Sequence, residues 1–141
     1  MKVEIFYDVY KEKLNNYSVA TTEGVGFLQR YLEGNIPSEG AEEILATHYA
    51  EIFGQDGDKG AQNHFLRAKD TLISANVDNL ECGLPIKEPT EADIATEEEA
   101  HAGADLVSDA HYELSKNGEF SLDTMDRIRN FGVEQVEDSA Q

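Results

Sequence analysis

The sequence predicts an α+β fold, in which an N-terminal β-hairpin with a short helix precedes a mainly helical region of about four helices. Three observations predict it: polar and apolar residues alternate near the N-terminus, apolar residues follow helical spacing over most of the remainder, and 40% of the 141 residues are apolar. That content suffices for one hydrophobic core. We therefore expect a single acidic domain, divided into 1–34 (hairpin plus helix), 35–132 (helical region) and 133–141 (a frayed tail).

The hairpin is predicted from two short alternating segments. The β-branched and aromatic residues Val3, Ile5, Tyr7 and Val9 alternate with Glu4, Phe6, Asp8 and Tyr10, which favours a strand from Lys2 to Tyr10. A second alternation, from Tyr17 to Thr21, predicts the returning strand, with a turn at Asn15-Asn16 because asparagine tolerates left-handed backbone. A two-stranded hairpin is marginal alone. The next segment, capped by Thr22 and closed by Gly34, is therefore expected to be a helix packed on it.

Two further helices are expected before residue 90. The first opens at Ser38 and ends at Gly54, with one broad apolar face. The second begins at Ala61 and should stop near Asn76. Residues 77–89 have no clear period and contain two prolines, so we expect an irregular connection there.

The segment from Thr96 to Glu113 holds six carboxylates and no Lys or Arg. The T-x-x-E pattern at Thr96 predicts that a helix starts there, and Thr90 with Asp93 offers an earlier start. One face of this helix is apolar, and three acids lie almost opposite. The apolar members are Ala100, Ala104, Val107, His111 and Leu114; the acids are Glu98, Asp105 and Asp109. A last helix is expected from Ser121 to Gly132.

The charge of the chain restricts its partners. The formal net charge is -18, and residues 90–141 alone carry 14 acids against 3 bases. Such a chain repels nucleic acid and anionic membranes, so direct binding to either is not expected. A basic protein is the natural partner. With one cysteine, Cys82, and no apolar run of membrane-spanning length, we expect a cytoplasmic protein without disulfides.

The acidic helix supplies the expected partner-binding residues: Glu97, Glu98, Asp105, Asp109 and Glu113. Glu98 and Asp105 are about 10 Å apart along a helix axis, and Asp105 and Asp109 about 6 Å. Phosphates on one nucleic-acid strand are spaced on a comparable scale. Such a row can imitate phosphates and occupy the basic cleft of a nucleic-acid-binding protein. The alternative is a solvated face that serves solubility.

Other chemistry is weakly indicated. Glu98 and His101 have the Glu-x-x-His spacing of di-iron bundles, but the chain has no second such pair. Residues Glu113 to Thr124 resemble an EF-hand loop, but Thr124 stands where the loop requires a bidentate glutamate. The chain has no nucleophile or phosphate-loop motif. We therefore expect no enzyme activity, no cofactor and no bound metal.

In charge and size the chain is similar in type to small inhibitors that phages and mobile elements use against host nucleases, although no motif carries that similarity. It implies a non-enzymatic nucleic-acid mimic that inhibits, for example, a restriction or CRISPR nuclease. Two alternatives remain open: a shape-specific interaction or immunity module, and a degenerate EF-hand-like domain that responds to calcium.

Overall fold

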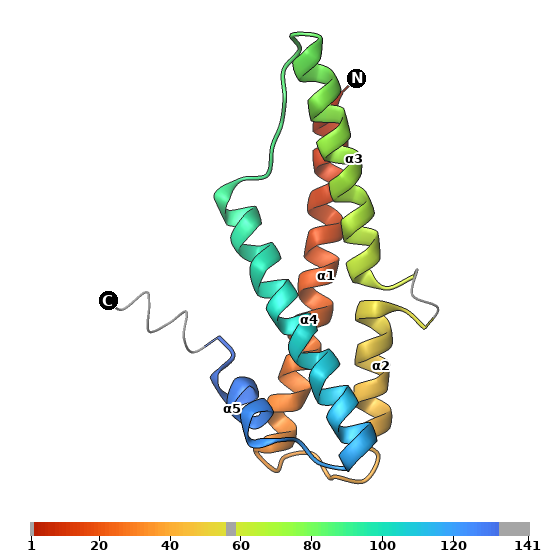
Figure 1. Cartoon of the computed structure of the whole chain (residues 1–141), viewed down its shortest axis with the longest axis vertical. Coiled ribbons are helices and arrows are strands. Elements are labelled where there is room, and N and C mark those ends of the chain that lie inside the picture. The colour runs from red at the N-terminus through yellow and green to blue at the C-terminus, as the bar shows by residue number, and fades with distance from the viewer. Residues whose placement is uncertain (1, 56–58, 133–141) are drawn as a thin grey trace, which may run out of the picture.

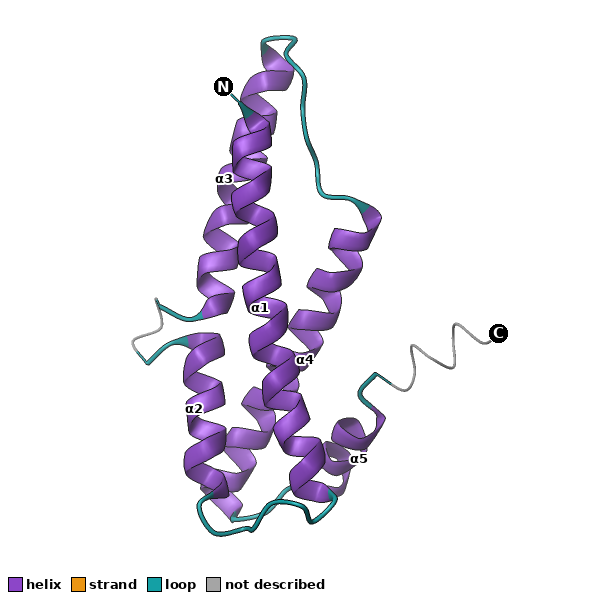
Figure 2. Ribbon diagram, turned by 180° about the vertical axis from the view of Figure 1, so that it is seen from behind, coloured by secondary structure: helices purple, strands orange, loops and turns teal. Residues whose placement is uncertain are grey.

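In the computed structural model, which describes residues 2–55 and 59–132, the chain folds into helices. They are α1 (Val3–Leu32), α2 (Ala41–Phe53), α3 (Ala61–Glu81), α4 (Glu91–Asn117) and α5 (Leu122–Asn130). Figure 1 shows α2 and α3 following one another alongside the long α1, while α4 crosses α1 and α5 lies near the end of α1. The view from behind shows the same arrangement (Figure 2).

The predicted α+β fold is wrong, because the N-terminal segment is one continuous helix and the described residues contain no strand. The inward-facing positions of α1 recur in alternating steps of four and three residues, which is the spacing of a helix–helix seam. They are Val3, Tyr7, Tyr10, Leu14, Tyr17, Thr21, Gly24 and Leu28. The alternation that suggested a strand is incidental, since Ile5 and Val9 are exposed.

Gly24 lies in α1 where α4 crosses it. A Cβ added there would lie 2.9 Å from Cγ2 of Val107, so a larger residue would push the helices apart. Gly103 of α4 has a similar position, because its Cβ would lie 3.1 Å from Cβ of Thr21. The absence of a side chain at Gly24 and Gly103 therefore allows α1 and α4 to pack closely.

The remaining helices follow the sequence pattern with shifted ends. α4 begins at the earlier of its two expected starts, where Thr90 and Asp93 form a reciprocal capping box, and the start at Thr96 is wrong. α3 continues past Asn76 to Glu81. Its buried Asn76 holds the connection 82–90 by bonding both the N–H and the C=O of Lys87. The frayed tail expected at 133–141 lies outside the described residues.

Along α4 the expected division into faces is confirmed. Ala100, Ala104, Val107 and Leu114 are buried, and Glu98, Asp105 and Asp109 are exposed. No helix in residues 2–55 and 59–132 combines the length and the apolar character that a membrane crossing requires.

Candidate functional site

The outer face of α4 carries a row of exposed carboxylates. Glu91, Glu98, Asp105 and Asp109 are separated by seven, seven and four residues, so they lie close to one line along the helix. Among the described residues, Glu91, Glu98 and Asp105 have no ion-pair partner. Their negative charge is therefore directed at solvent.

Beside this row, a shallow groove of about 430 Å³ separates α4 from α5. Its charged lining consists of three carboxylates and one guanidinium: Glu99, Asp105, Asp126 and Arg127. Arg127 donates to Asp109 over 2.8 Å, and both side chains are substantially exposed. The groove and the row share Asp105, so they form one continuous acidic surface. We define the acidic surface as Glu91, Glu98, Glu99, Asp105, Asp109 and Asp126.

Glu97, expected in the partner-binding row, faces the interior instead. Its side chain is 13% exposed, and one carboxylate oxygen lies 2.6 Å from Nζ of Lys69 on α3 and 3.2 Å from Nε2 of His101. His101 in turn lies 2.7 Å from the hydroxyl of Tyr17, through Nδ1. Glu97 is therefore a link between α3 and α4, and His101 points toward α1 and Glu97.

Glu113 also has an internal role. Its carboxylate accepts from the backbone N–H of Ser121 at 2.6 Å and from the hydroxyl of Thr124, both at the start of α5. Burial acts to raise the pKa of Glu113, but these hydrogen bonds outweigh it and lower the pKa. The resemblance to an EF-hand loop thus falls on a helix cap, in which Glu113, Ser121 and Thr124 bind one another.

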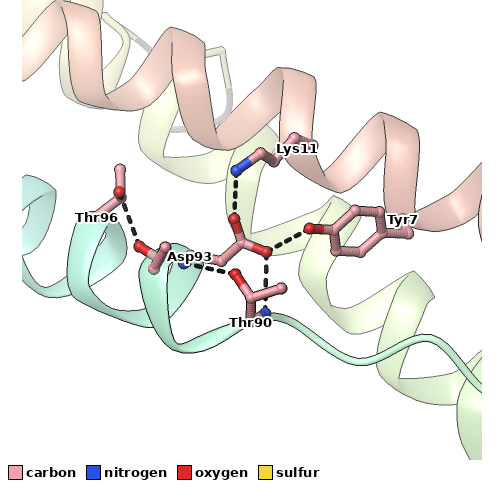
Figure 3. Close-up of polar contacts among 6 residues, drawn as sticks. Tyr7, Lys11, Thr90, Asp93 and Thr96 are labelled. Carbon is pink, nitrogen blue, oxygen red and sulfur yellow. Dashed lines mark hydrogen bonds and ion pairs between the residues drawn. The ribbon is translucent and has the colours of Figure 1, made fainter.

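The most strongly bound carboxylate, Asp93, was recognised from the sequence as a helix cap and nothing more. It is fully buried, and it binds Lys11 and the hydroxyl of Tyr7, the latter at 2.5 Å, besides its bond to the N–H of Thr90 (Figure 3). Burial acts to raise the pKa of Asp93, but the hydrogen bonds from Lys11, Tyr7 and Thr90 lower it to about 2. No sequence signal connects Asp93 to Lys11, which lies 82 residues away.

Tyr10 lies in the same region, close enough to Asp93 and Glu97 for both charges to act on its hydroxyl. Its ring is fully buried against Phe65, and its hydroxyl has no hydrogen-bond partner in the described part of the chain. Desolvation, followed by the charges of Glu97 and Asp93, raises the pKa of Tyr10 to about 12. Tyr10 is therefore a core residue of the α1–α3 packing, and the polar contacts of Asp93 and Glu97 lie beside it.

Comparison with protein-family models, with curated proteins and with solved structures finds no match for this chain. Within residues 2–55 and 59–132, His, Cys, Asp and Glu side chains form no group of three that could hold a metal ion. Of the five residues expected to bind a partner, Glu98, Asp105 and Asp109 belong to the acidic surface, whereas Glu97 and Glu113 make internal contacts.

Proposed function

We propose that this chain is a non-enzymatic acidic protein that binds the basic, nucleic-acid-binding surface of another protein and inhibits it by taking the place of phosphates. The observation that supports this proposal is the concentration of carboxylates on one surface, to which the described residues supply only two ion pairs, both exposed. Glu91, Glu98 and Asp105 are exposed on α4, and Glu99 and Asp126 line the adjoining groove.

The acidic surface does not stabilise the fold by itself. Asp105 and Asp109 are four residues apart, and like charges at that spacing repel one another by a few tenths of a kcal/mol. The two ion pairs that the described residues supply to this surface, Asp109 with Arg127 and Asp126 with Arg129, are both exposed. Exposed pairs contribute about 0–1 kcal/mol, so a Lys or Arg of a partner can replace Arg127 at Asp109. A partner that neutralises this surface gains Coulomb energy and relieves the repulsion within it.

The proposal is tested with two variants of equal charge change. Glu98→Lys with Asp105→Lys reverses the centre of the acidic surface. Asp8→Lys with Glu12→Lys reverses two exposed acids on α1, outside it. We expect the first pair to weaken binding to a restriction endonuclease, a guide-loaded CRISPR nuclease or a basic toxin nuclease at least tenfold, which is about 1.4 kcal/mol. The second pair should weaken it less than threefold.

Titration calorimetry at about 0.1 M salt measures both affinities, and circular dichroism verifies that both variants fold. Raising the salt to about 0.5 M should weaken the wild-type complex, because the screening length falls to about 4 Å. Equal losses in the two variants would show that only net charge matters. Binding that withstands both the reversal and the salt would favour a shape-specific module, and binding to none of the three nucleases would contradict the proposed partner class.

A further inference from the structure

Exposed apolar side chains concentrate on α3, on the connection that follows it and at the start of α4. Thirteen large hydrophobic residues of the described chain are exposed, and seven of them lie between residues 66 and 94. They are Leu66, Ile73, Val77, Leu80, Leu84, Ile86 and Ile94. Single exposed apolar residues are ordinary, whereas a contiguous set marks a site of interaction.

Four of these residues form a line on α3, which we call the α3 stripe: Leu66, Ile73, Val77 and Leu80. At 100° per residue they fall within an arc of about 60° and extend over about 21 Å of helix. Steps of seven, four and three residues are those of a coiled-coil seam. Phe65 and Leu72, which face α1, are fully buried, so α3 is apolar on a second side as well.

The described chain leaves the α3 stripe uncovered. α3 packs on α1 and α2, whereas isolated side-chain contacts such as Lys69 with Glu97 join it to α4. Figure 1 shows α4 diverging from α3 toward the end where α3 finishes, and Figure 2 shows the same divergence from behind. The connection 82–90 is held beside α3 by Asn76 and Asn79, yet Leu80 remains 67% exposed.

The charges around the α3 stripe are mainly negative. On the helix, Asp70 lies about 20° and Glu81 about 40° beyond the edge of the stripe, and both are exposed. Glu88, which is exposed, follows in the adjoining connection. The nearby lysines are engaged, since Lys69 pairs with Glu97 and Lys87 lies 5.0 Å from the centre of the Tyr7 ring.

We infer that the α3 stripe is a docking site for an amphipathic helix of another protein, with apolar residues at its a and d heptad positions and Lys or Arg beside them. The seam spacing matches a helix, and the surrounding carboxylates match basic flanks. A second copy of this chain would bring its own Asp70 and Glu81, and a further net charge of -18, against the same acids. This inference is independent of the proposed function, because the α3 stripe contains no residue of the acidic surface.

The probe is a fluorescein-labelled peptide of three heptads with Leu at positions a and d and Lys at positions e and g. Its affinity for the full-length chain is measured by fluorescence anisotropy at about 0.15 M salt. Val77→Ser interrupts the α3 stripe, and the matched control is Val19→Ser on α1, because both valines are exposed within long helices, at 48% and 56%. We expect Val77→Ser to weaken binding at least fivefold and Val19→Ser less than twofold.

Two further peptides separate apolar docking from charge attraction. A scrambled peptide of the same composition, and one with Glu in place of Lys, should each bind at least tenfold more weakly. The Glu98→Lys, Asp105→Lys variant should bind the original peptide, which we call the Lys peptide, with an affinity within twofold of wild type. That result would show that the peptide does not bind at the acidic surface. No binding of the Lys peptide, equal binding of any control peptide, or equal effects of the two valine variants would overturn the inference. So would a homodimer, detected by sedimentation equilibrium, that Val77→Ser dissociates.

Discussion

The carboxylate of Asp93, fully buried at the start of α4, binds the ammonium group of Lys11 on α1. The same carboxylate accepts from Tyr7 and from the N–H of Thr90. One side chain therefore caps α4 and attaches it to α1, at the end where α4 begins to diverge from α3. This contact places the acidic row of α4 relative to the rest of the molecule.

Replacing Asp93 with Asn should destabilise the protein by about 1–3 kcal/mol. The substitution keeps the shape of the side chain but removes the charge that binds Lys11 and leaves buried polar groups poorly satisfied. Urea unfolding followed by circular dichroism measures the change. Asp78→Asn, at an exposed position of α3, should change stability by less than about 0.5 kcal/mol. Equal effects of the two variants would show that the buried contact contributes nothing.

Asp93 also predicts how stability depends on acid. Its pKa is about 2 in the folded chain, below the ordinary value of 3.8, so folding favours the ionised form. The stabilisation is fully present above pH 3.8 and is lost as the pH falls toward 2. Between pH 5 and pH 2, the free energy of unfolding should therefore decrease less with falling pH for Asp93→Asn than for wild type. Parallel curves would contradict the assignment.

The two glycines in the C-terminal third of α1, Gly24 and Gly26, should respond oppositely to alanine. Gly24→Ala brings a methyl group to 2.9 Å from Val107, and we expect a loss of about 1–3 kcal/mol. At Gly26 the added Cβ would meet the flexible end of Arg30 at 3.4 Å, so better helix propensity should stabilise the chain by up to about 1 kcal/mol. Thermal unfolding distinguishes them, and stabilisation by both substitutions would mean that α1 and α4 are not closely packed there.

Glu113→Gln should loosen α5 without unfolding the rest of the chain. The glutamine retains one acceptor for the N–H of Ser121 and the hydroxyl of Thr124, but it loses the charge that strengthens both bonds. Hydrogen exchange should become faster at the amides of α5 and remain unchanged in the middle of α1. The control is Glu119→Gln, an exposed neighbour. Faster exchange in both variants, or in neither, would refute the capping role.

Particular residues show which parts of the fold can be predicted from the sequence. Local signals located the helix around Val107 and the exposure of Glu98, because helical spacing depends on near neighbours. They offered the capping box of Thr90 as the second of two starts, and the first, at Thr96, was wrong. The alternation of Val3, Ile5, Tyr7 and Val9 suggested a strand, while a longer seam of alternating four- and three-residue steps extended through α1. The longer period identifies the helix, and it is evident only when the whole segment is read together.

The candidate site was predictable only in part, for a different reason. Glu97 and Glu98 are adjacent and chemically identical, yet one binds Lys69 of α3 and the other faces solvent. Glu113 is likewise engaged by the start of α5. Which carboxylates remain available to a partner therefore depends on contacts between helices. The local sequence pattern does not predict such contacts.

The central claim, that the acidic surface takes the place of nucleic acid, is tested most directly by competition. A nuclease that binds the chain is loaded with a fluorescent DNA duplex and titrated with the chain at several DNA concentrations. We predict that the chain displaces the duplex and that its apparent inhibition constant rises linearly with the DNA concentration. The apparent inhibition constant should rise at least tenfold for the Glu98→Lys, Asp105→Lys variant. It should remain close to the wild-type value for the Asp8→Lys, Glu12→Lys variant. A ternary complex in which chain and DNA are bound together, or inhibition independent of DNA concentration, would contradict the claim.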